Sequence, residues 1–342
     1  MIDPNNLNPR HNESKHWCLL TCGTSNKRRR RDAPVVTLEI NDSDVYRRTG
    51  FVDTKAMLVF IMIVHNGDVE SIANRKTSTL TWFEEWFFYF EMMHGKTIMR
   101  WKDAGVLYNI REDVLRSIFD FRLFLVLRCR CSWPLYASHN EDVRLRKEKW
   151  NERYEKHRVV MWDDTNITLG HKPGDAQLQR LTYSSYYGEN CAKGGVALQL
   201  CGWIRVMNLW VGATSDTHYQ ENSNIFGEQN NFSSNDLIAG NHLPFTNIFD
   251  KGYRSRLAAW RSGRQLTLQP NYARSNRKFH AKETIQSAPI ATNRSANERA
   301  VKICKMSSFL KRGLKNNGDP VRLDNAWLAW SFQANFMYKP VL

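Results

Sequence analysis

The sequence has no apolar run long enough to span a membrane. The longest, AMLVFIMIV at residues 56–64, is about half of the roughly 20 residues that a bilayer-spanning helix needs. Residues 1–20 carry Asp, Asn, His and Glu where a secretory signal peptide needs a basic start and an apolar stretch. We therefore expect neither a membrane anchor nor secretion.

Cysteine and glycine are also scarce. The 7 Cys are an odd number and show no paired spacing, which argues against a disulfide scaffold and favours reduced thiols. The 18 Gly in 342 residues exclude a collagen-like chain. Because 42% of the residues are hydrophobic, most of the chain can bury a core. Its length leaves room for two domains, or for one large domain with appendages.

Negative charge is in short supply. The 49 Lys and Arg outnumber the 34 Asp and Glu, which gives a formal net charge of +15. Such a surplus favours a polyanionic partner, because each phosphate contact releases condensed counterions. Nucleic acid is the expected partner. A membrane surface is the alternative, but no segment joins a basic face to a clean apolar stripe as an interfacial helix does.

Part of this surplus lies near the start of the chain. Residues 1–34 are polar, contain three Pro and include the run Lys27, Arg28, Arg29, Arg30 and Arg31, whose like charges repel one another. We interpret residues 1–34 as a disordered basic tail and the run as a nuclear import signal or a DNA-clamping arm. The alternative is a solvated charge cluster without a function.

Residues 35–150 have the hydrophobic pattern of a mostly helical region. Apolar spacing predicts helices through residues 56–64, through residues 82–94 and from Ile110 onward, and the charged segment at residues 142–158 predicts one connecting helix. The aromatic positions are typical of a core, with a base-stacking surface as the alternative. No motif assigns a function to this region, although DNA or partner binding fits its place in the chain.

After His157 the pattern changes to that of β-strands. Alternation and turn residues predict short helices within residues 214–241 and 253–262, and a last helix from Ser295 to a stop at Gly313. The predicted strands are VVMW at 159–162, the hairpin of GVALQLC (195–201) and IRVMNLWV (204–211), FTNIF at 245–249 and QLTLQ at 265–269.

Three carboxylates fall where these elements can meet. Asp163 and Asp250 each follow a predicted strand, and Glu298 lies in the first turn of the last helix. Clustered carboxylates repel one another unless a hard divalent cation such as Mg²⁺ neutralises them. Two such ions can activate the attacking oxygen and stabilise the leaving oxygen of a phosphodiester. The alternatives are an ordinary turn residue for each Asp and a capping box from Ser295 to Glu298.

The same region carries a family resemblance. The blocks are Trp162-Asp163-Asp164-Thr165-Asn166-Ile167, Tyr183-Ser184 to Lys193-Gly194-Gly195, Cys201-Gly202-Trp203, Gly212-Ala213-Thr214-Ser215-Asp216, Asp250-Lys251-Gly252-Tyr253-Arg254 and Arg294-Ser295-Ala296-Asn297-Glu298-Arg299-Ala300. In order and character they resemble the Harbinger-type DDE transposases and their derived nucleases. The similarity covers about residues 158–315.

The resemblance implies an α/β fold of RNase H-like type, a mixed sheet flanked by helices, over residues 151–315. We expect a mostly helical N-terminal domain at residues 35–150 to precede it and a C-terminal extension at residues 316–342 to follow it.

The resemblance also implies a metal-binding catalytic triad at Asp163, Asp250 and Glu298, with Mg²⁺ or Mn²⁺ as the cofactor, bound as two ions. Asp163 stands two residues before a Thr, as in the family's Asp-x-Thr pattern, but the adjacent Asp164 leaves an ambiguity of one residue. Asp216 matches a Gly-x-x-Ser-Asp position outside the usual triad. It is a further candidate ligand or a helix cap.

Four basic residues lie beside these motifs and are candidates to contact DNA near the scissile phosphate, where charge develops in the transition state. Ordinary surface charge is the alternative for each of them. They are Lys193, Lys251, Arg254 and Arg299.

The activity implied by the resemblance is that of a nuclear, metal-dependent DNA endonuclease or transposase that nicks transposon ends and transfers the 3′-hydroxyl strand to target DNA. The implied partners are double-stranded DNA, a Myb-like DNA-binding protein and a second copy of the chain. A transposase-derived module that binds DNA or protein without cutting is the alternative, and an inert adaptor explains neither the charge nor the carboxylates. The sequence has no serine-hydrolase elbow, Walker loop or His-Glu-x-x-His helix.

Overall fold

The structure is a computed structural model. It describes residues 41–66, 80–94, 100–133, 136–154, 158–170, 173–222, 237–238, 241–242, 245–249, 266–268, 281–311 and 319–338. The chain divides into two units, Met1–Asn41 and Asp42–Leu342, and the second holds all the described helices and strands. None of the described helices combines the length and the hydropathy that a bilayer crossing requires.

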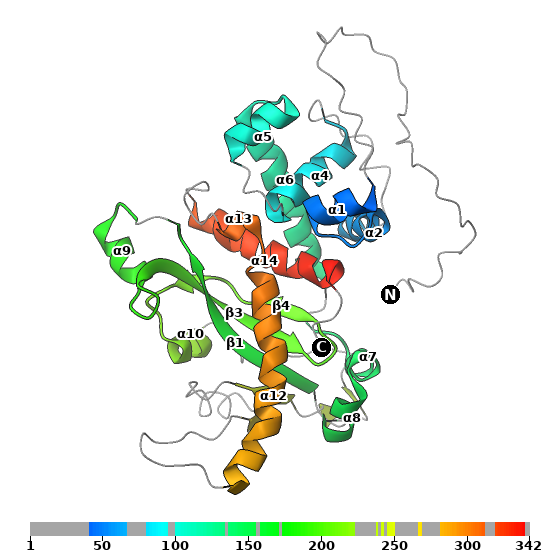
Figure 1. The fold of residues 1–342 in the computed structure, drawn as a ribbon, viewed down its shortest axis with the longest axis vertical. Coiled ribbons are helices and arrows are strands. Elements are labelled where there is room, and N and C mark those ends of the chain that lie inside the picture. Colours follow the sequence, from blue (N-terminus) through cyan, green and yellow to red (C-terminus); the bar gives the residue numbers. More distant parts are fainter. Residues whose placement is uncertain are drawn as a thin grey trace, which may run out of the picture. The chain divides into compact units, whose positions relative to one another are not determined.

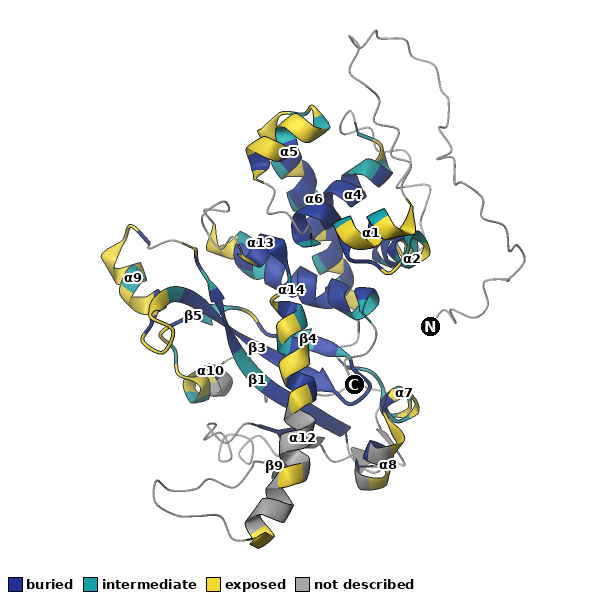
Figure 2. Cartoon of the chain, in the orientation of Figure 1, coloured by how far each residue is buried: buried dark blue, intermediate teal, exposed yellow. Residues whose placement is uncertain are grey.

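The first part of the larger unit is helical, as predicted (Figure 1). Helix α2 begins where the Asp53 carboxylate accepts a hydrogen bond of 2.6 Å from the Ala56 amide, which satisfies a donor that the first turn leaves open. Helix α4 is buried along nearly all of its length, so it forms the centre of this region (Figure 2). The helices are α1 (Asp42–Thr49), α2 (Thr54–Val64), α4 (Trp82–His94), α5 (Trp101–Tyr108) and α6 (Glu112–Ser132).

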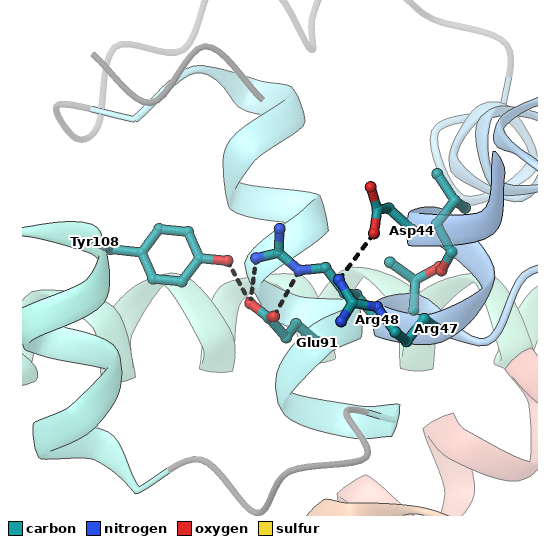
Figure 3. A network of polar contacts seen from close by, with 7 residues as sticks. Asp44, Arg47, Arg48, Glu91 and Tyr108 are labelled. Carbon is teal, nitrogen blue, oxygen red and sulfur yellow. Dashed lines mark hydrogen bonds and ion pairs between the residues drawn. The ribbon is translucent and has the colours of Figure 1, made fainter. Parts of the chain in front are cut away.

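Helix α4 buries two carboxylates, and each meets an arginine. Glu91 accepts hydrogen bonds of 2.8 and 3.1 Å from the Arg48 guanidinium and one of 2.7 Å from the Tyr108 hydroxyl (Figure 3). Glu85 accepts a hydrogen bond from Arg122, and both side chains are almost fully buried. A buried charge is costly unless it is paired and hydrogen-bonded. These pairs therefore lower the free-energy cost of burying the two carboxylates of α4.

The single connecting helix predicted at residues 142–158 is wrong. The structure has two short helices there, α7 (His139–Leu145) and α8 (Glu148–Tyr154). Ser138 and Glu141 form a capping box that begins α7 before the predicted segment, and Arg146 has an extended backbone that ends it. Charge patterning alone does not contain either signal.

A mixed sheet follows the helices. Among the described residues its order is β2-β3-β1-β8-β9, with β4 and β5 also paired to β3. Strand β1 is antiparallel to β3 and parallel to β8, and β8 is parallel to β9. The strands are β1 (Arg158–Thr168), β2 (Tyr183–Ser184), β3 (Glu189–Gln199), β4 (Ile204–Val206), β5 (Trp210–Val211), β8 (Phe245–Ile248) and β9 (Leu266–Leu268), and β6 (Leu237–Ile238) pairs separately with β7 (Asn241–His242).

The predicted hairpin is confirmed as β3 and β4, with Gly202 at a φ of 90° in the turn between them. This left-handed conformation favours glycine. The strand predicted over residues 204–211 is interrupted and forms β4 and β5. The helix predicted at residues 253–262 lies outside the described residues.

Helices cover the sheet and join it to the first helical region. Helix α14 contacts α2, α6 and α12, and it also contacts β4. It is largely buried, and the Trp327 indole donates a hydrogen bond of 2.9 Å to the Met207 carbonyl. The predicted domain boundaries at residues 34, 150 and 315 stay predictions. These helices are α9 (Ala176–Thr182), α10 (Asp216–Asn222), α12 (Ala281–Cys304), α13 (Ser308–Lys311) and α14 (Pro320–Met337).

Candidate active site

Strand β1 carries the first candidate ligand in its interior. The prediction that the strand ends before Asp163 is wrong, because β1 runs to Thr168 and pairs with β3 along this whole stretch. Asp163 lies opposite Val196 and Asp164 lies opposite Gly195, and both carboxylates are half-buried. Because successive side chains of a strand point to opposite faces, only one of the two can share a face with any third ligand.

Asp164 lies on the face covered by α10. Its cross-strand neighbour Gly195 is so close to Tyr219 of α10 that a Cβ on this glycine would lie 2.7 Å from the tyrosine ring. The Gly195 amide donates a hydrogen bond of 2.8 Å to the Tyr219 hydroxyl. Burial, and then the nearby charge of Asp164, raise the pKa of Tyr219 above its ordinary value. Asp164 is therefore part of the environment of a buried phenol.

Asp163 lies on the opposite face, which helices α14 and α12 cover. Thr165, on the same face as Asp163, pairs with Gly194, and a Cβ on Gly194 would lie 2.8 Å from the Trp327 side chain of α14. Helix α14 is tied to α12 by a hydrogen bond of 3.1 Å from the Trp330 indole to the Ile303 carbonyl. Helix α12 in turn contacts β1 and β3 (Figure 1).

Helix α12, which carries Glu298, packs on this side of the sheet. It buries three small side chains, Ala296, Ala300 and Cys304, whose spacing of four residues places them along one face of the helix. Small side chains allow a helix to approach a sheet closely. Glu298 lies between them in the sequence, and its side chain is exposed. Asp163 and Glu298 therefore come from elements that meet on one face of the sheet.

The start of the last helix differs from the prediction. Helix α12 begins at Ala281, not at Ser295, so Glu298 lies in its interior rather than in its first turn. The capping-box alternative for Glu298 is therefore wrong, because the amides near Ser295 already lie within the helix. Arg299 is exposed, and its guanidinium donates a hydrogen bond of 3.4 Å to the Ser295 hydroxyl one turn earlier.

Lys193 of β3 and Asp216 of α10 form an ion pair. The Lys193 ammonium, which is buried, donates a hydrogen bond to the Asp216 carboxylate, which is half exposed. The register of β1 and β3 places Lys193 opposite Asn166 and thus on the face of Asp164. Asp216 begins α10, and the Ser215 hydroxyl accepts a hydrogen bond from the His218 amide. The helix cap is therefore Ser215, and Asp216 pairs with a lysine from the sheet.

The remaining predicted site residues lie outside the described residues. These are Asp250, Lys251, Arg254 and the basic run at residues 27–31. Among the residues that the structure does describe, no group of three or more His, Cys, Asp and Glu side chains is arranged to hold a metal ion. The chemistry of the two described candidate ligands, Asp163 and Glu298, fits such an ion, since hard divalent cations bind carboxylate oxygens.

The sequence reasoning missed two features of the site. One is the pairing of Lys193 with Asp216, and the other is the burial of Asn297, which is 3% exposed although it precedes the exposed Glu298. Lys193 and Asp216 lie on different elements, and no local pattern in the sequence links them. Asn297 lies in the block of residues that carries the resemblance, so its position in that block was the available signal.

A family model matches the part of the chain that carries these candidate residues. The model of the DDE superfamily endonuclease matches residues 162–332, half of the chain. No curated protein matches the chain, and neither does any solved structure. The matched range begins in β1 and ends in α14, so it contains Asp163, Lys193, Asp216 and Glu298. On the strength of this match, the chain belongs to the DDE superfamily endonucleases.

Proposed function

We propose that the protein is a divalent-metal-dependent DNA endonuclease of the Harbinger transposase type. In this proposal it nicks the phosphodiesters at transposon ends and transfers the 3′-hydroxyl strand to target DNA. The observation that carries the proposal is the origin of Asp163 in β1 and of Glu298 in α12, two elements that contact each other within the matched range. Family membership supports the nuclease chemistry.

An RNase H-like fold is part of the proposal. The support is the mixed sheet, in which an antiparallel β1–β3 pair continues into the parallel strands β8 and β9. Helix α12 lies against the two longest strands of this sheet. This arrangement would place the end of β8, after which Asp250 follows in the sequence, beside the strand that carries Asp163.

The proposed ligands are Asp163, Asp250 and Glu298, which would hold Mg²⁺ or Mn²⁺, as two ions. When bound, such ions activate the attacking oxygen and stabilise the leaving oxygen of a phosphodiester. Asp163 is preferred to Asp164 because it lies on the face that α12 covers. The alternative ligands are Asp164, beside Tyr219, and Asp216, whose charge Lys193 partly neutralises.

Basic side chains would position the DNA around this site. Arg299 is exposed next to Glu298, where it can reach a phosphate oxygen. Lys251 and Arg254 follow Asp250 in the sequence, and we propose the same role for them. Lys193 would contribute through Asp216, because its ammonium is engaged with that carboxylate. Charge-assisted contacts of this kind stabilise the negative charge that develops on the reacting phosphate.

The proposed partners follow from the charge and from the resemblance. A net charge of +15 supports double-stranded DNA as the substrate. A Myb-like DNA-binding protein would supply sequence-specific targeting, and a second copy of the chain would supply a second active site. The run at residues 27–31 is proposed as a nuclear import signal, which fits an enzyme that acts on chromosomal DNA.

A plasmid-nicking assay tests the proposed function. Wild-type protein with Mg²⁺ or Mn²⁺ should convert supercoiled plasmid to the open circle, and a chelator should stop the conversion. The Asp250→Asn variant should bind DNA but not nick it, because the amide keeps the size of the side chain and removes the charge that holds a cation. A wild-type protein that binds DNA without nicking it, even with a Myb-like partner and candidate transposon ends, would identify a non-cutting DNA-binding module instead.

A further inference from the structure

Two tyrosines stand exposed at the tip of the turn between β2 and β3. Tyr186 is 87% exposed and Tyr187 is 50% exposed. Their rings lie edge to face, with centroids 4.9 Å apart and planes at 77°. The turn is closed by a hydrogen bond of 2.8 Å from the Gly188 amide to the Ser184 carbonyl, with Gly188 at a φ of 70°. The rings are thus presented to solvent by a short hairpin with defined backbone geometry.

The hairpin is rooted in the strand that borders the site. Strand β2 pairs with β3 at Tyr183 with Asn190 and at Ser184 with Glu189. Strand β3 then continues along β1 and pairs with it from Cys191 onward, through the positions opposite Asp164 and Asp163. The turn with Tyr186 and Tyr187, called the tip below, is therefore continuous with β3, the strand that pairs with β1.

Burial, then the Tyr186 phenol and the charges of Asp216, Cys191 and Asp163, raise the pKa of Tyr187 above its ordinary value. The Tyr187 phenol is neutral at physiological pH, as it would be at the ordinary tyrosine pKa. It adds no negative charge beside the carboxylates, and its hydroxyl can donate a hydrogen bond to a phosphate oxygen.

We propose that the Tyr186–Tyr187 tip stacks against an unpaired DNA base beside the phosphodiester that is cut. The inference rests on the proposed function, because it takes DNA as the substrate. Aromatic side chains bind unpaired bases by stacking, and this contact tolerates any base because each has a π-face. Within an intact duplex those faces are covered by neighbouring bases, so the tip should distinguish frayed or nicked DNA from an intact duplex.

The position of the tip favours DNA over a protein partner. Its exposed rings belong to tyrosines, whose hydroxyls can donate hydrogen bonds to phosphates, and its hairpin continues into the strand that pairs with β1 at Asp163. A strand bound for hydrolysis must pass beside Asp163 in the proposed function, so its neighbouring bases would pass beside the tip.

A fluorescence assay tests this inference. The probe is a duplex with a single-stranded 3′ overhang that carries 2-aminopurine at the junction, and a fully paired duplex of the same sequence is the comparison. Both are titrated with full-length protein in the presence of a chelator, so that no cutting occurs. Stacking on an aromatic ring should quench the 2-aminopurine in the overhang probe.

The double variant Tyr186→Ala/Tyr187→Ala should lose the quenching and bind the overhang probe roughly 5- to 150-fold more weakly, the range for loss of a base–aromatic stack. Its affinity for the paired duplex should stay within about 2-fold of wild type, because phosphate contacts dominate that binding. Tyr187→Phe keeps the ring and should retain the quenching. Tyr46→Ala removes a tyrosine of similar exposure, 52%, from α1 and should behave as wild type.

The outcomes separate this inference from the proposed function. If the double variant quenches the 2-aminopurine and binds the overhang probe as the wild type does, the stacking role is overturned. This holds whether or not the protein nicks plasmid. An equal loss of affinity for both probes would also overturn it, since the tip would then be a general contact. If the wild type fails to nick but the double variant selectively loses overhang binding, the proposed function fails and the stacking role is supported.

Discussion

Carboxylates in the helical region and in the sheet region have different surroundings. Glu85 and Glu91 of α4 are 3% and 8% exposed, and Arg122 and Arg48 respectively bind them. In the sheet region Asp163 is half-buried in the middle of a strand and Glu298 is exposed on a helix that contacts it. The carboxylates of α4 are neutralised by internal arginines and serve packing, whereas Asp163 and Glu298 keep partial or full access to solvent.

The electrostatics of the helical region support this distinction. Burial alone would lower the pKa of Arg48, but its hydrogen bond to Glu91 and the charge of that carboxylate outweigh burial, so the pKa is raised. The Arg122 guanidinium also lies over the Trp86 ring, 5.0 Å from its centroid. Arg48 thus stays charged inside the helical region. The carboxylate partners of these arginines have no need of an external ion.

The largest effect should come from the sheet region. Glu298→Gln should reduce metal-dependent nicking by about 100-fold or more. Replacing a residue that only hydrogen-bonds to a metal ligand already lowers activity or metal affinity roughly 10–100-fold, and a ligand itself should matter at least as much. The measurement is the rate of plasmid relaxation at saturating Mn²⁺, together with DNA affinity, which should stay close to that of wild type.

Glu112→Gln is the matched control for this variant. It removes a carboxylate that is 44% exposed on α6, where it pairs with Arg116. Its nicking rate should equal that of wild type. Equal loss in the two variants would mean that acidic charge in general supports activity, and the comparison between the regions would fail.

The next effect is on stability and belongs to the helical region. Arg122→Met leaves the Glu85 carboxylate buried without the guanidinium that binds it, so the free energy of unfolding should fall by about 3–5 kcal/mol. Adding Glu85→Leu removes the buried charge and should recover part of the loss. Urea unfolding of the single and double variants measures both values.

Arg111→Ala provides the surface counterpart. The Arg111–Asp113 pair spans 2.6 Å, but its side chains are 81% and 61% exposed. Exposed pairs contribute roughly 0–1 kcal/mol, so the free energy of unfolding should barely change. If Arg122→Met costs no more than this surface variant, the buried pairs do not stabilise the helical region.

The smallest effect should appear at alkaline pH. Burial raises the pKa of Tyr338 to about 12, and burial together with the charge of Glu91 and a hydrogen bond to it raises that of Tyr108 well above the ordinary value of 10.0. Below the ordinary tyrosine pKa of 10.0, the folded and the unfolded chain both keep the protons of these two phenols. Above it the unfolded chain loses protons that the folded chain retains, so stability must fall with rising pH.

Urea unfolding at about pH 8 and about pH 10.5, on either side of the ordinary tyrosine pKa, measures this fall. Tyr108→Phe should make the fall shallower, because one of the shifted phenols is removed. A free energy of unfolding that stays constant over this range would show that the buried phenols are not protected from titration.

Local patterns in the sequence were sufficient for the elements that depend on neighbouring residues. The helix through residues 56–64 is an example, and so is the turn at Gly202 between β3 and β4. The start of α12 at Ala281 was missed because Pro289 lies within the helix, and proline in a helix interior usually signals a break.

The candidate site depended on long-range information to a greater extent. The sequence predicts Asp163 and Glu298 as candidate ligands, but it leaves Asp164 as an alternative to Asp163. That choice depends on the register of β1 with β3 and on which helix covers each face. The pairing of Lys193 with Asp216 likewise joins two elements that no local pattern connects.

The most direct test compares two adjacent substitutions in one strand. Asp163→Asn should abolish metal-dependent nicking, because its side chain lies on the face that α12 brings Glu298 to. Asp164→Asn should retain nicking, because its side chain lies on the opposite face beside Tyr219. Both variants should bind DNA as the wild type does. If Asp164→Asn abolishes nicking while Asp163→Asn retains it, the assignment of the active face is contradicted.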